Sequence, residues 1–379
     1  MQIIWLYGPP AVGKSTTAWQ LYVDLSATGI SCAYVDIDQL GMCYPAQLQD
    51  PDRHRLKGLA LAAIVPNYAN AGAGTLIISG VLDPNLIPWY HEVLNGTDLV
   101  FCRLSIEEDE LRRRHDARKA SQDTWQNSLE AMHALDAARL THLRIEAKGQ
   151  TPQEVADSLR IKLRLTSGTR TVATPLFSSR AAVETIHRQP SGEIIWLTGT
   201  SAVGKSTVAW ATFSLLRTRG ITAGYLDLQQ LGFAGNALGD PDHVLQSANV
   251  ASLWECFGAA GATHLVMSGS AETDEQVHLY REAFFSAHLT LFCLRASRET
   301  LEERVRSRGR GEGPRLAGDR LVDQPAAILE REIDRSWTDQ LRLNSRCIGD
   351  VVINTNGLTP KTISEQLTSE STRSMQNQT

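Results

Sequence analysis

A stretch of 14 residues occurs twice in this chain and constrains the fold more than any other feature. Residues 3–16 read IIWLYGPPAVGKST and residues 194–207 read IIWLTGTSAVGKST, so 11 of 14 positions agree at an offset of 191. Agreement at this level indicates an internal duplication, and a duplication sets the architecture of the whole chain. We therefore expect two tandem copies of one domain.

The duplication extends beyond this stretch. The same offset pairs Gly29 with Gly220 and Asp36 with Asp227. Further along, the register drifts, and the second half carries an insertion around residues 309–325. The repeat therefore spans most of both halves.

The length of the chain agrees with two domains. A chain of 379 residues is too long for one ordinary core, whereas domains of roughly 150–200 residues are common. Between the repeats Thr, Ser, Arg and Pro displace periodic apolar residues, and the C-terminal end is polar. The sequence predicts a first domain at 1–165, a linker at 166–191, a second domain at 192–368 and a mobile tail at 369–379.

Composition excludes several classes of protein. Hydrophobic residues make up 42% and charged residues 21%, which is typical of globular proteins, and the net charge of −5 counts against nucleic acid as a partner. The six cysteines form no C-x-x-C pair and lack the spacing of a zinc site. Neither a signal peptide nor a membrane-spanning stretch is evident. We expect a cytoplasmic protein.

Each half alternates short apolar runs with amphipathic segments, which predicts an α/β fold. Continuous apolar runs are typical of strands buried on both faces of a parallel sheet. A helix with a 3.6-residue apolar period follows the first run, and Gly29 ends it. We expect about five strands, flanked by helices. In the first half the predicted strands are Ile3–Tyr7, Ala33–Ile37, Thr75–Ser79 and Leu99–Leu104.

Both copies of the repeated stretch match the phosphate-binding pattern G-x-x-x-x-G-K-[ST]. A strand precedes and a helix follows each match, so backbone N–H groups and the helix N-terminus face a phosphate. The lysine reaches the β- and γ-oxygens and the next serine places its hydroxyl on Mg²⁺. The sequence thus predicts ATP and Mg²⁺ at two sites. Their predicted residues are Gly8, Ala11, Val12, Gly13, Lys14, Ser15 and Thr16, and Gly199, Ala202, Val203, Gly204, Lys205, Ser206 and Thr207.

With these loops, each half resembles the small-molecule kinases of the P-loop superfamily, which include shikimate kinases, adenylylsulfate kinases, chloramphenicol phosphotransferases and AAA_33-type ATP-binding proteins. The resemblance implies the usual strand order of such kinases, 2-3-1-4-5, and in them an acid at the end of the second strand binds the acceptor. The resemblance implies that Asp38 orients or deprotonates the acceptor hydroxyl. It also implies that Asp36, with Asp227 in the second half, helps to hold Mg²⁺ beside Ser15 and Ser206.

The second half departs from this pattern at one position. Gln229 stands where the first half has Asp38, and an amide is not a useful proton acceptor. We expect the first domain to carry the reaction and the second to be degenerate or regulatory. Strand alternation is expected to place Asp36 and Asp38 on one face, although aspartates at a strand end also serve simply as caps of the next segment.

Arginines follow the fourth strand of each half. Residues 111–118 and 301–308 resemble the arginine-bearing lid that closes over ATP in these kinases, because a planar guanidinium suits the charge that spreads over the γ-oxygens. The alternative is a solvated basic helix face. The predicted lid arginines are Arg114 and Arg118 in the first half and Arg304 and Arg308 in the second.

Three further segments bear on function. Residues 147–152 and 354–360 resemble the turn that cups adenine. The third strands end in Ser79-Gly80 and Ser268-Gly269 instead of the Walker B aspartate, which disfavours motor-type hydrolysis of ATP. Candidates for an acceptor pocket are Tyr44, His54, Arg55 and Trp89.

Taken together, the residues predict an ATP-dependent phosphotransferase that acts on a hydroxyl of a small molecule, either a metabolite or an antibiotic. Two alternatives stay open: a polynucleotide 5′-hydroxyl kinase, and an ATP-binding switch or assembly module without phosphotransfer. Contacts between the halves, or between copies of the chain, stay open as well.

Overall fold

The chain forms two compact units that largely follow the two halves of the sequence. The computed structural model describes residues 1–117, 122–165, 189–235, 242–312 and 321–376. Unit 1 comprises residues 1–41, 52–185 and 233–245, and unit 2 comprises residues 42–51, 186–232 and 246–379. Two short segments therefore belong to the unit of the other half, which the sequence did not predict.

Unit 1 is built on a parallel sheet of five strands in the order β2-β4-β1-β5-β6. When only the strands of unit 1 are counted, this is the predicted order 2-3-1-4-5. The side chains of β1 from Ile3 to Tyr7 are fully buried, as expected for a central strand covered on both faces. The strands are β1 (Gln2–Tyr7), β2 (Cys32–Asp36), β4 (Thr75–Ser79), β5 (Asp98–Ser105) and β6 (Leu143–Glu146).

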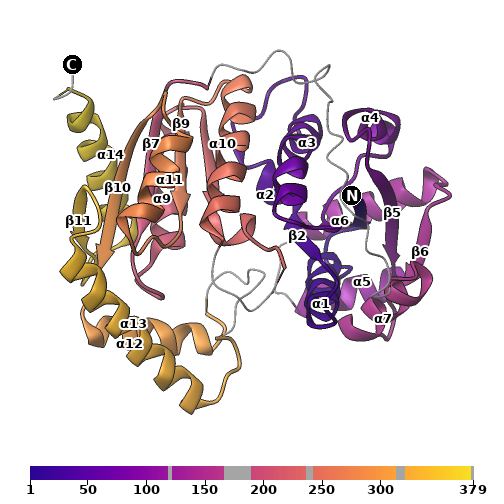
Figure 1. Ribbon diagram of the computed structural model, residues 1–379. Helices are drawn as coiled ribbons and strands as arrows, with labels where there is room; N and C mark the ends of the chain where they lie inside the picture. Colours follow the sequence, from indigo (N-terminus) through magenta and orange to yellow (C-terminus); the bar gives the residue numbers. More distant parts are fainter. Residues whose placement is uncertain (118–121, 166–188, 236–241, 313–320, 377–379) are drawn as a thin grey trace. The chain divides into compact units, whose positions relative to one another are not determined.

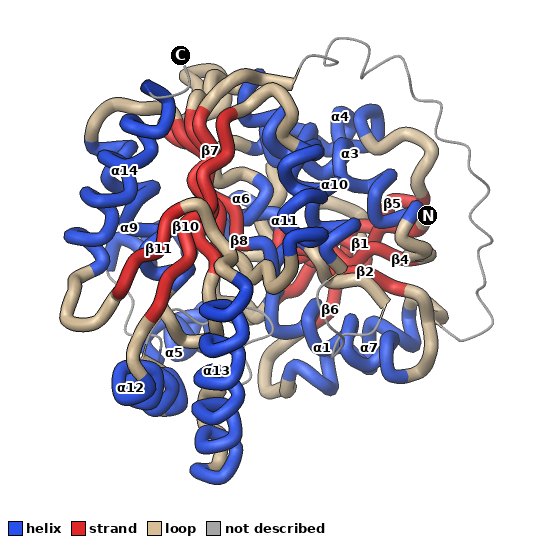
Figure 2. Tube along the Cα trace, turned by 60° about the vertical axis from the view of Figure 1, so that its left-hand side comes forward, coloured by secondary structure: helices blue, strands red, loops and turns tan. Residues whose placement is uncertain are grey.

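Helices cover both faces of this sheet (Figure 1). Helix α1 packs beside α7, and Figure 2 shows the same pair from another side. Leu21, Tyr22 and Leu25 form the buried face of α1. The helical segments of the first half are α1 (Lys14–Ala27), α2 (Ile37–Leu40), α3 (His54–Asn70), η1 (Pro84–Leu86), α4 (Ile87–Val93), α5 (Glu108–Ala117), α6 (Gln122–Ala137) and α7 (Pro152–Lys162).

Unit 2 repeats this plan, so the predicted fold class of two P-loop α/β domains is confirmed. Its sheet runs β11-β10-β7-β9-β8-β3. The strands from the second half are β7 (Glu193–Thr198), β8 (Ala223–Asp227), β9 (His264–Ser268), β10 (His288–Arg295) and β11 (Val351–Asn354). The helical segments are α9 (Lys205–Thr218), η2 (Leu228–Leu231), α10 (His243–Ala259), α11 (Asp274–Ala283), α12 (Arg298–Gly309), α13 (Ala326–Arg346) and α14 (Pro360–Gln376).

The sixth strand of unit 2 comes from the first half of the sequence. Strand β3 (Cys43–Tyr44) pairs antiparallel with β8. Tyr44 packs on the core of unit 2, and the guanidinium of Arg217 lies 4.3 Å from the centre of its ring. Tyr44 is therefore not part of an acceptor pocket in the first domain, which corrects the expectation from sequence.

Unit 1 has the reciprocal arrangement at its own edge strand. Residues 233–235 run along β2, where the N–H of Tyr34 donates to the carbonyl of Phe233 at 3.0 Å. The ring of Phe233 meets that of Trp19 edge-on, with centroids 4.7 Å apart. The outer edge of β2 in unit 1 and the outer edge of β8 in unit 2 are thus both covered by another segment. This protects the two edges from pairing with other chains.

Because residue 233 belongs to unit 1, a substitution in the second half of the sequence is expected to destabilise a unit built mainly from the first half. Replacing Phe233 with Ala is expected to destabilise unit 1 by about 2–3 kcal/mol, somewhat less than the cost at a fully buried phenylalanine. Hydrogen exchange at the amide of Tyr34, which bonds to residue 233, would report the loss. Phe285→Ala is the control, because that side chain is 75% exposed. Unchanged protection of Tyr34 would contradict the prediction.

The boundaries differ from the expected ones at the C-terminal end. Helix α14 continues to Gln376, whereas the sequence predicted a mobile tail from residue 369. The reason is that no Gly or Pro follows Pro360 to stop the helix, and polarity alone does not end one. Residues 166–188 of the predicted linker and 313–320 of the insertion lie outside the described residues. Among the described helices, none combines the length and the apolar character that a membrane crossing requires.

Candidate functional site

The chain between β1 and α1 forms a tight loop. A Cβ on Gly8, at φ +154°, would lie 2.5 Å from the carbonyl oxygen of Leu104, so only glycine fits there. Ala11 and Gly13 also have positive φ values, of 67° and 105°. Such a conformation turns successive backbone N–H groups toward one concave side, where they attract anions. Gly13 is the N-cap of α1, so the positive end of the helix dipole faces the same side.

The lysine of each loop lies over this concave side. Lys14 Nζ donates to the carbonyl oxygens of Gly8 and Pro9, both at 3.0 Å. In unit 2, Lys205 Nζ donates to Gly199 and Thr200 at 2.8 and 2.7 Å. The loop of unit 2 also repeats the backbone of the first, with φ values of 58° at Ala202 and 103° at Gly204. The two loops thus share one backbone conformation, and their lysines make the same contacts.

A cluster of oxygen atoms lies below the loop of unit 1. Ser15 Oγ and Ser79 Oγ both donate to Asp36 Oδ2, at 2.8 and 2.9 Å. Asp36 and Ser79 are register partners at the ends of β2 and β4, so the sheet itself brings them together. Unit 2 repeats the cluster, with Ser206 and Ser268 donating to Asp227 at 2.9 and 3.2 Å.

The buried aspartate of each cluster is electrostatically perturbed. Burial raises the pKa of Asp36, the nearby charge of Asp38 raises it further, and hydrogen bonds from Ser15 and from the backbone of Asp38 oppose the rise. Burial likewise raises the pKa of Asp227. Carboxyl groups held in this way against the cost of burial are typical of functional sites. A bound divalent cation would favour the ionised form.

Asp38 lies near Asp36 for a structural reason that differs from the predicted one. Strand β2 ends at Asp36 and helix α2 begins at Ile37, so strand alternation does not align the two acids. Instead, Asp36 Oδ1 caps α2 by accepting from the backbone N–H of Asp38 at 3.0 Å. A Cβ placed on Gly80 would lie 2.4 Å from Cγ2 of Ile37 and 3.6 Å from Asp36 Oδ1 and from Asp38 Oδ2, so this glycine lets the backbone pass close to Ile37 and to both carboxylates.

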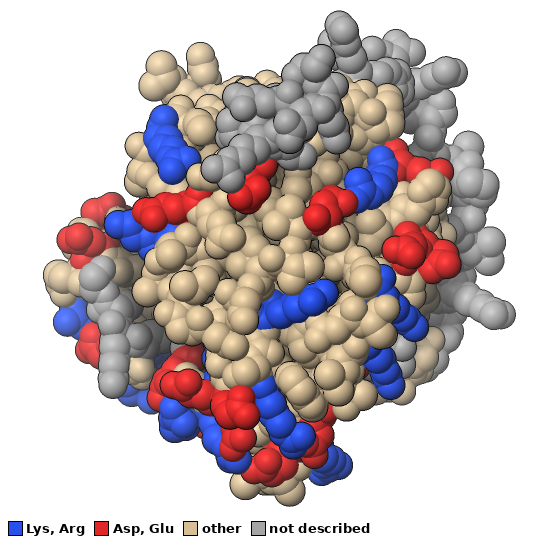
Figure 3. Space-filling view, turned by 90° about the vertical axis from the view of Figure 1, so that its left-hand side faces the viewer, with Lys and Arg blue, Asp and Glu red and all other residues tan. Residues whose placement is uncertain are grey.

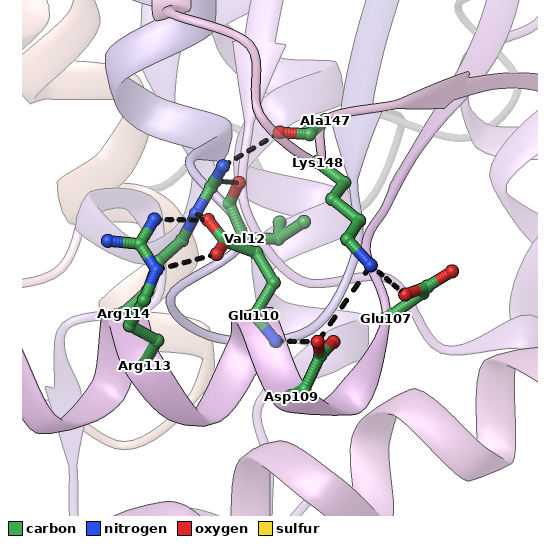
Figure 4. A network of polar contacts seen from close by, with 8 residues as sticks. All are labelled: Val12, Glu107, Asp109, Glu110, Arg113, Arg114, Ala147 and Lys148. Carbon is green, nitrogen blue, oxygen red and sulfur yellow. Dashed lines mark hydrogen bonds and ion pairs between the residues drawn. The ribbon is translucent and has the colours of Figure 1, made fainter.

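Arg114 joins the phosphate loop to the turn after β6 (Figure 4). Its Nη1 donates to the carbonyl of Val12 at 2.8 Å and its Nη2 to that of Ala147 at 2.7 Å. Its Nε donates to Glu110 Oε1 at 2.7 Å, and together with Arg113 it lowers the pKa of Glu110 to about 2. The resemblance implied a lid residue, whereas the structure gives Arg114 a bridging place between two loops.

Arg304 has the corresponding contacts in unit 2. It donates to the carbonyl of Val203 at 2.6 Å and to both oxygens of Thr355, at 3.0 and 3.3 Å. The turn at residues 147–152, and its counterpart at 354–360, is therefore tied to a phosphate loop in each unit. This position suits the predicted adenine-cupping role.

The other two predicted lid arginines are Arg118 and Arg308. Arg118 lies outside the described residues. The charge of Arg308 helps to lower the pKa of Lys205, so Arg308 belongs to the electrostatic surroundings of the unit 2 loop. Its neighbour Arg306 instead pairs with Glu302 and Glu330. Figure 3 shows acidic and basic side chains intermixed at the lower end of this face, where Figure 1 places α12 and α13. Around Arg306, helix α12 thus fits the alternative expectation, a solvated basic helix face.

Sequence reasoning missed one charged residue of the site, Lys57 on α3. Its Nζ lies 2.8 Å from Asp38 Oδ1. Only a residue-by-residue comparison of the two halves around this lysine would have drawn attention to it. Two of the predicted pocket residues, Arg55 and Trp89, stack on each other, with the guanidinium 5.3 Å from the ring centre. The structure does not assign His54 a role in an acceptor pocket.

Comparisons of the chain with known proteins gave matches among solved structures. No family model and no curated protein matches the chain. Matching solved structures include a sugar kinase from Janibacter sp. HTCC2649 (19% identity, 44% of this chain, 97% of the other, TM-score 0.34) and the tunicamycin resistance protein of Deinococcus radiodurans (20%, 44%, 98%, 0.33). The APS kinase of Mycobacterium tuberculosis, solved with AMPPNP and APS, matches at 19% identity over 48% of this chain and 97% of its own, with a TM-score of 0.31. Each of these proteins is matched almost whole by less than half of this chain.

Proposed function

We propose that the chain is an ATP-dependent phosphotransferase whose unit 1 phosphorylates a hydroxyl group of a small molecule. One observation supports the proposal most strongly. Asp36 lies against the phosphate loop through Ser15, while Asp38, two residues further on, has a side chain that is 49% exposed. A site for the polyphosphate thus adjoins a carboxylate that an incoming alcohol can reach.

The residues support an in-line transfer. The acceptor oxygen forms a bond to the γ-phosphorus, the bond between this phosphorus and the β,γ-bridging oxygen breaks, and ADP leaves with the bonding electron pair. Asp38 orients the hydroxyl and accepts its proton. Lys14 and the backbone N–H groups of the loop stabilise the charge on the β- and γ-oxygens.

The oxygen cluster below the loop is suitable for Mg²⁺. Magnesium prefers oxygen ligands, and it is commonly held by one or two protein groups, the substrate phosphates and water. Ser15 and Asp36 supply such groups at one place, with Ser79 beside them. When bound there, the ion would supply charge neutralisation at the phosphates.

Unit 2 has the residues that we propose bind the nucleotide but not the acid that we propose binds the acceptor. Its loop, Lys205, Ser206 and Asp227 match those of unit 1, whereas Gln229 replaces the acceptor-side acid. We therefore assign unit 2 a nucleotide site without phosphoryl transfer. The sequence left open an ATP-binding switch without phosphotransfer as the function of the whole chain. We propose such a role for unit 2 alone.

The nucleotide site of unit 2 should depend on pH in a definite direction. Burial and the charge of Arg308 lower the pKa of Lys205 to about 8. The ammonium is present below this pH, and above it binding of ATP must take up a proton, so the affinity falls by up to tenfold per pH unit. Calorimetry of Mg·ATP with Lys14→Ala at pH 7, 8 and 9 isolates this site. The matching titration of Lys205→Ala is the control, and constant affinity from pH 7 to 9 would contradict the prediction.

The acceptor can be found by a mass-shift screen. The intact chain is incubated with Mg·ATP and a panel of hydroxylated metabolites and antibiotics, and each mixture is searched for a product heavier by one phosphoryl group. A single-stranded oligonucleotide with a 5′-hydroxyl is included, so that a polynucleotide kinase would be recognised. Lys14→Ala is the negative control. Failure of every acceptor in the panel would argue against the proposed transfer and for a nucleotide-dependent switch.

A further inference from the structure

Lys57 forms an ion pair with Asp38, the acid that we propose binds the acceptor. The Lys57 side chain is only 9% exposed, and its Nζ lies 2.8 Å from Asp38 Oδ1. A Cβ on Gly41 would lie 2.6 Å from the Cγ and Cε atoms of Lys57, so the glycine makes room for the lysine stem. A buried ammonium is costly without a partner, so this geometry is held by the pair itself.

Unit 2 keeps the frame around this pair but neither charge. Gly232 stands in the place of Gly41, because a Cβ there would lie 2.7 Å from Nε2 of Gln246. Gln246 thus takes the place of Lys57, and it donates to the carbonyl of Leu228 at 2.8 Å. The backbone of Gln229 bonds to Asp227 as the backbone of Asp38 bonds to Asp36. Within one chain, the acid and its lysine are therefore both present in one unit and both replaced by glutamine in the other.

We infer that Lys57 is a positioning residue that acts through Asp38: it holds one carboxylate oxygen so that the other faces the acceptor hydroxyl. The inference rests on the proposed phosphotransferase function. Lys57 is too buried to be a main contact of the acceptor, whereas Asp38 remains half exposed. The ion pair is made by Oδ1, and the other oxygen, Oδ2, lies on the side of Gly80. The ammonium also offsets the mutual repulsion of Asp36 and Asp38, two carboxylates that both lie close to Gly80.

A double-mutant cycle in the full-length protein tests this inference. Initial rates are measured with Mg·ATP and the acceptor from the screen, and in a parallel series with water as the acceptor. Lys57→Met is expected to lower kcat by roughly 10–100-fold, because a misplaced acid loses its alignment with the hydroxyl. The KM for ATP should stay within about twofold, since the phosphate loop is intact. Adding Lys57→Met to Asp38→Asn should lower kcat no further.

Two results would overturn the inference. One is a Lys57→Met enzyme with nearly the kcat of the original chain, and the other is a full multiplicative loss on top of Asp38→Asn, which would mean that Lys57 acts without Asp38. Lys57→Gln, which copies Gln246, is measured in parallel in case the methionine variant does not fold, and thermal melting checks both. If the original chain itself transfers no phosphoryl group, the proposed function has failed first.

Discussion

Replacing Asp38 with asparagine is expected to lower kcat for phosphoryl transfer by roughly 10²–10⁴-fold, the usual contribution of a positioned general base. The amide keeps the size of the side chain but cannot accept the proton of the acceptor hydroxyl. The carboxylate of Asp38 bonds to Lys57 on α3, outside the phosphate loop. The affinity for Mg·ATP should therefore change by less than about threefold.

The measurement compares kcat with the nucleotide Kd from calorimetry for the same preparation. Gln229→Asn is the matched control, because it alters the corresponding position of unit 2, where no proton acceptor is present. That variant should keep the full rate. A loss of nucleotide affinity in Asp38→Asn as large as its loss of rate would place Asp38 in the nucleotide site instead and would remove the basis for an acceptor at Asp38.

The fold was predictable because its signals are local. Each central strand is a continuous apolar run, and each phosphate loop is marked by glycines where the backbone needs positive φ, as at Gly13 and Gly204. The strand order followed from the resemblance to P-loop kinases and is confirmed. Since Ser15 and Asp36 each sit at a defined end of an element, their meeting in space was also predictable in outline.

The features that were missed depend on distant partners. Strand β3 has only two residues and no apolar period, so only its pairing with β8 defines it. Lys57 looks like one charged residue among others on a helix until its stem is seen packed over Gly41. Arg114 was assigned to a lid from its place in a basic run, but its contacts are with backbone carbonyls of two loops, which no local pattern encodes.

A pair of loop variants should separate the two units functionally. The intact chain is expected to bind two equivalents of Mg·ATP, and Lys14→Ala and Lys205→Ala one tight equivalent each, because each lysine donates to carbonyls of its own loop. Lys14→Ala should lower the transfer rate by roughly 10²–10³-fold or more, since it removes a cation that stabilises the charge developing on the transferred group. Lys205→Ala should keep transfer within about tenfold of the original rate, because unit 2 lacks a proton acceptor at Gln229.

The comparison is informative because the two substitutions are chemically identical and differ only in the unit that carries them. Thermal melting with and without Mg·ATP checks that each variant is folded and still gains stability from its remaining nucleotide. Equal loss of transfer in both variants would mean that unit 2 takes part in the reaction. A stoichiometry of one for the intact chain would mean that the second loop, despite its backbone and its Ser206–Asp227 pair, does not take up nucleotide.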